Sequence, residues 1–244
     1  MSFSNDNNPK STYAWQTLHR VGGMAALAVL VLIPIQMVVF FLWPPPNSVI
    51  GWFTLFQDNP LVGLLDMDLL LIVDYLLLIG VFSALWASLR RANESLMAIA
   101  LILQLVATAT YLASTVAFEM LTLSNQYATA TTDVERSIFL AAGQTMLATW
   151  QGTAFDVSYV LSALAILTVS AVMLRSHRLF SKVTGYAGLS AGILALVPPT
   201  AGTIGVVLSL VSLVPMVIWL ALIARRLFAQ GLLKEIPSLP NNRN

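Results

Sequence analysis

Cysteine is absent from the 244 residues of this chain, and histidine occurs only twice. The absence of cysteine excludes disulfide bonds, thiolate metal sites, iron–sulfur clusters and thiol nucleophiles. The two histidines, His19 and His177, fall near the ends of apolar segments, and we expect both to lie at the surface. The sequence therefore indicates no catalytic residue, leaves any metal or cofactor open, and makes an enzyme less expected than a binding protein.

Charge is also scarce. Only 9% of the residues are charged and 58% are hydrophobic, whereas roughly a quarter of a soluble domain is charged. This composition predicts an integral membrane protein whose immediate partner is the lipid bilayer. The formal net charge is +1 and the basic residues are scattered, so a nucleic-acid partner is not expected.

Six apolar segments are candidates for membrane-spanning helices, which need about 20 residues each. They cover residues 21–43, 61–88, 96–121, 144–174, 182–197 and 205–227, with polar tails at 1–20 and 228–244. The predicted fold is all-α, a single polytopic membrane domain of six transmembrane helices. The first segment has no small-residue cleavage site and is expected to remain as a span. In the short fifth segment, Gly188 and Gly192 have the spacing of a close helix contact, which favours packing against the sixth.

Positive charge predicts the orientation of the chain in the membrane. Eleven of the twelve lysines and arginines fall on one side of the predicted spans, and only Arg136 falls on the other. Because positive residues are retained on the cytoplasmic side, we expect both termini to face the cytoplasm.

The second span has a clear start signal. Asp58 or Asn59 is placed to act as an N-cap, and Pro60 occupies the first helical position, where its missing N–H is not needed. A helix is therefore predicted to begin at this point.

Two segments between the spans have structure of their own. The stretch "NSVIGWFTLF" places Trp52, Phe53 and Phe56 close together, which favours a segment anchored in the membrane interface. Thr132 and Glu135 have capping-box spacing and predict a short helix that runs toward the fourth span. A lid over an outward-facing pocket is the alternative for both segments.

Five acidic residues fall within the predicted spans: Asp66, Asp68, Asp74, Glu119 and Asp156. An ionised aspartate at the centre of a bilayer costs about 3 kcal/mol, and no lysine, arginine or histidine lies beside these acids within the spans. Protonation, a water-filled cavity and a bound cation remain as explanations. Asp68 points away from Asp66 on a regular helix and is expected near the headgroups.

Polar side chains also form stripes on the third and fourth spans. Gln104, Thr108, Tyr111, Thr115 and Glu119 are spaced 4, 3, 4 and 4 residues apart and share one face of a helix. We interpret this pattern as one wall of an outward-facing acidic cavity, whose candidate ligand-binding residues are Asp66, Asp74, Glu119, Asp156, Gln151, Tyr111 and Tyr159. The alternative is that the threonines and glutamines join helices by hydrogen bonds.

Two blocks carry a family resemblance. They are "LLDMDLLLIVDYLLLIGVFSAL" in the second span, and "SHRLFSKVTGYAGLSAGILALV" continuing into "VVLSLVSLVPMVIWLALIARRLF". They resemble an uncharacterised family of bacterial six-span membrane proteins, catalogued as a domain of unknown function. The resemblance implies a location in the bacterial inner membrane, and it carries over no activity, cofactor or catalytic residue.

Three functions are compatible with these observations. The first is binding or transport of a cation, a proton or a small cationic molecule through the acidic cavity. The second is an accessory or structural subunit of a larger membrane complex, with other membrane subunits as partners. The third is a lipid-modifying enzyme that uses a carboxylate pair as acid and base.

Overall fold

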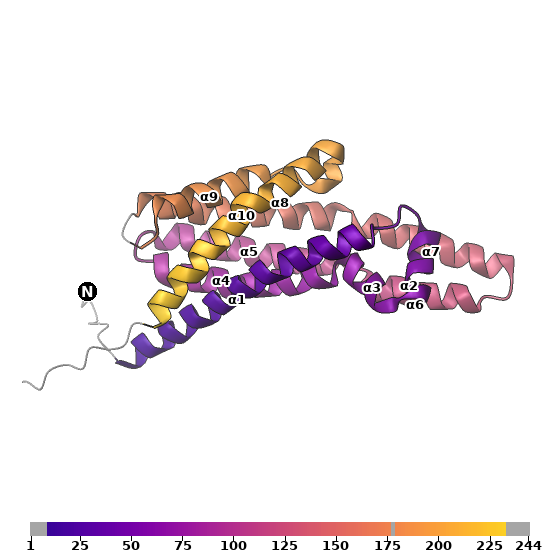
Figure 1. Ribbon diagram of the computed structural model, residues 1–244, viewed down its shortest axis with the longest axis horizontal. Coiled ribbons are helices and arrows are strands. Elements are labelled where there is room, and N and C mark those ends of the chain that lie inside the picture. The colour runs from indigo at the N-terminus through magenta and orange to yellow at the C-terminus, as the bar shows by residue number, and fades with distance from the viewer. Residues whose placement is uncertain (1–8, 177–178, 233–244) are drawn as a thin grey trace, which may run out of the picture.

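The computed structural model describes residues 9–176 and 179–232, and the secondary structure in these ranges is entirely helical. Ten α-helices and two short irregular helices follow one another along the described chain (Figure 1). The elements are α1 (Pro9–Leu42), α2 (Val49–Asp58), α3 (Pro60–Leu64), the π-helical η1 (Leu65–Leu69), α4 (Leu70–Leu89), α5 (Glu94–Ser114), α6 (Ala117–Thr129), α7 (Asp133–Trp150), α8 (Thr153–Arg175), α9 (Lys182–Leu194), the 3₁₀ turn η2 (Pro199–Ala201) and α10 (Gly202–Gly231).

Five helical stretches of the described chain are long and apolar enough to cross a membrane, and they contain α1, α4, α5, α8 and α10. The fifth predicted span, residues 182–197, corresponds to α9, which has 13 residues. At 1.5 Å per residue it is about 20 Å long, short of the roughly 30 Å of a bilayer core. The prediction of an all-helical chain with several apolar spans is confirmed, and the sixth span stays a prediction.

The start of α1 and the end of α10 lie together at one end of the bundle, which we call the tail end (Figure 1). Arg20 on α1 donates a hydrogen bond from Nε to the carbonyl oxygen of Gly231 at 2.8 Å. Further along the bundle, the two helices diverge.

Close helix contacts hold the bundle together. At Gly22 on α1, an added Cβ would lie 2.3 Å from Cβ of Ala84 on α4, so a side chain here would separate the two helices. Gly188 and Gly192 on α9 pack in the same way against α8, and Gly188 also faces Trp219 of α10. The predicted close packing of α9 therefore occurs within the chain. α9 packs mainly against α8 and also, as predicted, against the helix of the last span, α10.

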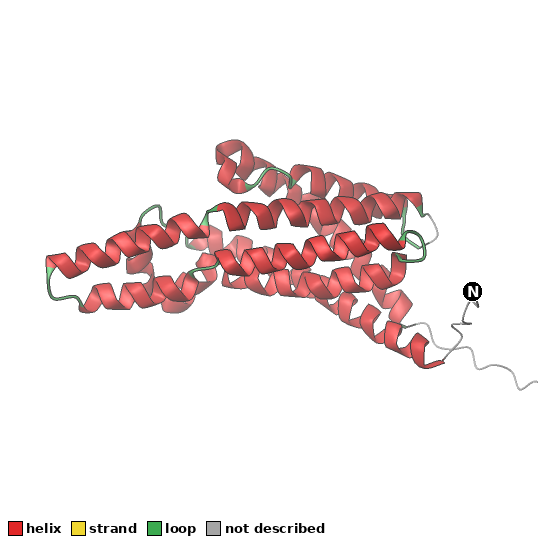
Figure 2. Ribbon diagram, turned by 180° about the vertical axis from the view of Figure 1, so that it is seen from behind, coloured by secondary structure: helices red, strands yellow, loops and turns green. Residues whose placement is uncertain are grey.

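The third and fourth predicted spans are each divided into two helices. α5 ends at Ser114 and α6 follows after a break at Thr115 and Val116, while α7 ends at Trp150 and α8 begins after Gly152. α6 and α7 form a hairpin that extends beyond the bundle at the end opposite the tails (Figure 2). The expected boundaries 96–121 and 144–174 therefore combined residues of the bundle with residues of this hairpin.

We call the projecting unit of α2, α6 and α7 the arm. Trp52, Phe53 and Phe56 of α2 are at most 1% exposed and form the centre of its core. The Trp52 ring meets the ring of Trp150 edge-on at 5.5 Å. These aromatic residues were expected to anchor the segment in the membrane interface, and that interpretation is wrong because they are covered by protein.

Both predicted helix starts are confirmed. Asn59, rather than Asp58, is the N-cap before Pro60, and its Oδ1 accepts a hydrogen bond from the Val62 backbone N–H at 3.2 Å. The capping box of α7 is complete, since Thr132 accepts from the Glu135 backbone N–H and the Glu135 carboxylate accepts from the Thr132 backbone N–H. A polar side chain thus satisfies N–H groups that have no partner within the helix.

Candidate functional site

A cavity of about 310 Å³ lies between α1, α4, α8 and α10, in the half of the bundle nearer the arm. This volume is at the lower end of the range for small-molecule sites. Most of the side chains that line it are apolar, among them Ile33, Leu78, Ile166 and Met216. The cavity therefore has the composition expected of a site for a largely apolar ligand with a few polar contacts.

Asp74 on α4 supplies the one carboxylate among the described residues that line this cavity, and none of them is basic. Its side chain is 6% exposed, and Oδ2 accepts a hydrogen bond from Nε2 of Gln36 on α1 at 3.0 Å. Oδ1 is buried without a hydrogen-bond partner. One carboxylate oxygen is thus held in place, and the other keeps its capacity to accept a hydrogen bond.

Aromatic rings form another wall of the cavity. Tyr75 of α4 stacks on Tyr111 of α5 with ring centroids 4.1 Å apart and an interplanar angle of 4°. Phe155 and Tyr159 of α8 continue the row, with successive centroids 6.3 Å apart. Because the faces of aromatic rings attract cations, this wall and the Asp74 carboxylate both favour a positively charged ligand.

α1 and α10 both line the cavity, and the two helices diverge away from the tail end (Figure 1). Met37 on α1 and Leu210 on α10 both line it and are 40% and 49% exposed, respectively. On the α10 side, Ser209 and Ser212 lie beside Tyr159 and line the same cavity. Side chains that line the cavity therefore also reach the side of the bundle on both helices.

The structure brings three of the seven candidate ligand-binding residues together in this cavity: Asp74, Tyr111 and Tyr159. The other four lie elsewhere. Asp66 is fully buried in the π-helical turn, and Glu119 is exposed on the arm because the chain breaks before α6. Gln151 is exposed at the junction of α7 and α8. Asp156 is half-buried and accepts a hydrogen bond from the Thr200 hydroxyl. The side chain of Asp68 lies outside the described residues.

The polar stripe of α5 mainly joins helices. Gln104 and Thr108 are buried, and the Ser162 hydroxyl of α8 donates to Gln104 Oε1 at 2.9 Å. The Thr108 hydroxyl lies 3.2 Å from the Tyr75 carbonyl oxygen of α4. Hydrogen bonds of this kind are common between membrane helices, and they support the packing interpretation for this part of the stripe.

Gln36 is the residue of the site that was absent from the candidate set. It is a lone polar residue in the apolar run of the first span, and this is the signal that marks it. Its partner Asp74 lies 38 positions away, so only the packing of α1 on α4 reveals the pair.

No model of a known protein family matches this chain, and no curated protein or solved structure matches it. The resemblance seen in the second span and in the last two spans stays a prediction.

Proposed function

We propose that this protein is a membrane protein that binds a small lipophilic cation, such as a protonated or quaternary amine with an apolar body, in the cavity beside Asp74. The observation that carries the proposal is the Asp74 carboxylate, which is buried in an aromatic cavity, held through one oxygen by Gln36 and free to accept through the other.

The charge of the cavity supports a cation over an anion or a neutral ligand. Asp74 is its single carboxylate among the described lining residues, and no basic side chain there competes for it. Acidic residues within membrane helices face an interior or a cavity and commonly mark ion and substrate sites. A charge-assisted contact with such a carboxylate is about twice as strong as a neutral hydrogen bond.

The apolar lining supports an organic cation over a bare metal ion. A metal ion needs several oxygen or nitrogen ligands, whereas Asp74 and Gln36 provide few, and no group of three or more acidic or histidine side chains suited to a metal occurs among the described residues. The aromatic side chains of Tyr75, Phe155 and Tyr159 in the lining instead provide apolar surface for the body of an organic cation.

We also propose that both termini face the cytoplasm and that the arm projects on the opposite side of the membrane. The positive-inside distribution supports this orientation. α5 and α8 have 21 and 23 residues, about 31 and 34 Å at 1.5 Å per residue, which suits one bilayer core without the arm. In this orientation the cavity lies in the outer half of the membrane, where a lipophilic cation partitions from outside.

Thermal unfolding of the purified protein in detergent tests the proposal. The probes are benzyltrimethylammonium and neopentylbenzene, which have nearly the same shape and differ by one positive charge. We expect the cation to raise the melting temperature of the wild type and the neutral compound to have little effect. Asp74→Asn keeps the size of the side chain and an oxygen for Gln36, and it should weaken cation binding by about 10- to 100-fold.

Asp58→Asn is the matched control, because Asp58 is an exposed carboxylate at the end of α2. This variant should bind the cation as the wild type does. Equal stabilisation by the two probes, or a cation response that persists in Asp74→Asn, would refute the assignment of Asp74 as the cation-binding group.

A second candidate function, an accessory subunit of a membrane complex, is favoured by the arm. Val134 and Ile138 on α7 and Phe118 on α6 are 59–69% exposed, and such apolar surface on a projecting unit suits a partner protein. Recovery of the chain alone after extraction in mild detergent, with or without cross-linking, would argue against this function. The lipid-modifying alternative lacks comparable support, because the cavity is lined by a single carboxylate rather than a pair.

A further inference from the structure

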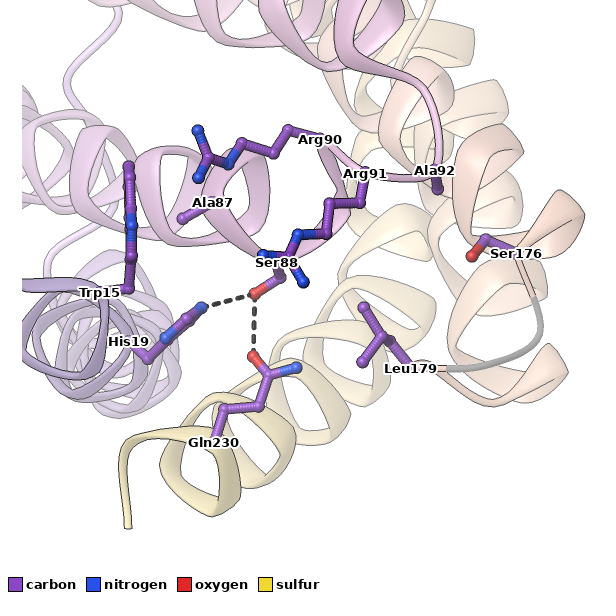
Figure 3. A pocket seen from close by; sticks show the side chains of 10 residues that line it. All are labelled: Trp15, His19, Ala87, Ser88, Arg90, Arg91, Ala92, Ser176, Leu179 and Gln230. Carbon is purple, nitrogen blue, oxygen red and sulfur yellow. Dashed lines mark hydrogen bonds between the residues drawn. The ribbon is translucent and has the colours of Figure 1, made fainter. Parts of the chain in front are cut away.

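A second cavity, of about 610 Å³, lies at the tail end of the bundle and is separate from the Asp74 cavity (Figure 3). Its walls come from the start of α1, the end of α4 with the turn that follows it, Ser176 and Leu179 after α8, and the end of α10. The cavity is therefore located where four parts of the chain reach the end of the bundle.

A hydrogen-bond network forms one side of this tail-end cavity. Nε2 of His19 lies 2.9 Å from the Ser88 hydroxyl, which donates to Gln230 Oε1 at 2.8 Å (Figure 3). The Ser88 hydroxyl also lies 2.9 Å from the Ala84 carbonyl oxygen, and the His19 ring is hydrogen-bonded to the Trp15 backbone. His19 was expected at the surface, and the structure instead places it half-buried in this network. His177 lies outside the described residues.

Two arginines give the cavity its charge. The Arg90 guanidinium lies over the Trp15 ring at 4.4 Å and near the Trp86 ring at 5.3 Å. Arg91 is exposed, and its side chain lines the same cavity along a different course from that of Arg90 (Figure 3). Among the described residues that line the cavity, none carries a carboxylate. A pocket with cationic and N–H donor groups and no acid is suited to an anion.

We propose that the tail-end cavity binds a phosphate group and that an anionic phospholipid headgroup supplies it. The guanidinium of Arg91 matches a phosphate in shape and can donate two parallel hydrogen bonds. Trp15, whose ring packs against Arg90, is the residue type that occurs at the headgroup level of membranes. Basic pockets between helices at the cytoplasmic surface are suited to anionic headgroups, and the orientation proposed above places this cavity there.

The test uses the full-length protein in a neutral detergent with three probes: dioctanoyl phosphatidylglycerol, dioctanoyl phosphatidylcholine and inorganic phosphate. Thermal unfolding and native mass spectrometry should show preferential binding of phosphatidylglycerol. Arg91→Gln should weaken this binding about tenfold or more, as expected for the loss of a charge-assisted contact, and Arg91→Lys should restore part of it. Arg136→Gln, which removes an exposed arginine from the arm, should have no effect.

Equal binding of the two lipids, or unchanged phosphatidylglycerol binding in Arg91→Gln, would overturn the proposal. Inorganic phosphate that binds as tightly as phosphatidylglycerol would overturn the lipid source, because the acyl chains and glycerol would then contribute nothing. Arg91 is exposed, so its replacement leaves the core packing intact and a loss of binding is not due to misfolding. Asp74→Asn should leave lipid binding unchanged, which separates this test from that of the cation cavity.

Discussion

The Gln36–Asp74 pair allows a direct test of whether the buried carboxylate is retained for stability or for a ligand. Both side chains are less than 9% exposed, and a single hydrogen bond of 3.0 Å joins them. We expect Gln36→Leu to destabilise the protein, because it leaves the carboxylate without its donor. Asp74→Leu should destabilise it less, because it leaves only the neutral amide of Gln36 without an acceptor.

The expected loss in the free energy of unfolding follows from the number of polar atoms that lose a hydrogen-bond partner. A buried polar group without a partner costs about 1–3 kcal/mol in soluble proteins, and hydrogen bonds between membrane helices average about 0.6 kcal/mol. We therefore expect losses of about 2 kcal/mol for Gln36→Leu and about 1 kcal/mol for Asp74→Leu. For a protein of this size this corresponds to a decrease in melting temperature of about 2–8 °C. The double variant Gln36→Leu/Asp74→Leu should be as stable as the wild type or more stable, since replacement of a polar pair by apolar groups is often neutral or stabilising.

Thermal unfolding of the four proteins in the same detergent measures this cycle. Losses that simply add in the double variant would refute the reasoning, because they would show that the two side chains do not act as a pair. A stable double variant that no longer responds to benzyltrimethylammonium would show that the fold does not require Asp74. The carboxylate would then be retained for the ligand.

Three further predictions concern the bundle and the arm. Gly22→Ala should destabilise the contact of α1 with α4 by about 1–3 kcal/mol. Ala84→Gly in the same chain should recover part of this loss, as measured by melting temperatures. No recovery would contradict the close approach of the two helices. Thr132→Ala should cost about 1 kcal/mol at the start of α7, seen as faster amide exchange in its first turn, whereas unchanged exchange would contradict the capping box. Phe53→Ala should destabilise the arm core by about 3–5 kcal/mol. Limited proteolysis should then cut the arm before the bundle. Cleavage equal to that of the wild type would contradict the burial of this ring.

Hydropathy and capping signals predict much of the fold. The apolar runs locate the helices of the bundle, Asn59 with Pro60 marks the start of α3, and Thr132 with Glu135 marks the start of α7. These signals are local, because a cap depends on residues within one helical turn. The sequence therefore predicts where these helices begin with good accuracy.

The breaks within the third and fourth spans are not predictable in this way. The apolar sequence continues through Thr115 and Val116 into α6, although the backbone leaves the helical conformation there. Apolar residues of α5 pack in the core of the bundle or are exposed on its surface, while those of α6 cover the aromatic core of the arm. Hydropathy does not distinguish these environments. The arm was therefore divided between an interfacial segment, a short helix and the ends of two predicted spans.

The sequence predicted the chemical character of the candidate site better than it predicted which residues form it. Asp74 was selected as an acid within a predicted span, Tyr111 as a member of the polar stripe and Tyr159 as a polar residue of the fourth span, and all three line the cavity. Asp66 was selected as another acid of the second span, but the π-helical turn at residues 65–69 interrupts the regular rotation of 100° per residue between it and Asp74. Gln36 and Asp74 come from different helices, so their pairing depends on tertiary packing that no periodicity reports.

The positions of the acids help to explain how the chain tolerates them. Five ionised carboxylates in lipid, at about 3 kcal/mol each, would rival the free energy of folding of about 5–15 kcal/mol. Glu119 belongs to the arm, and Asp156 lies at the start of α8 with a hydroxyl partner. Asp66 is fully buried in the π-helical turn beside the arm core, and its position alone does not explain how this acid is tolerated. Among these four acids, Asp74 alone lies within the bundle beside a cavity, where Gln36 donates a hydrogen bond to it. The cost of one such carboxylate, about 3 kcal/mol, is smaller than the free energy of folding. Because Asp74 is also the one placed to meet a ligand, we consider it the residue to mutate first.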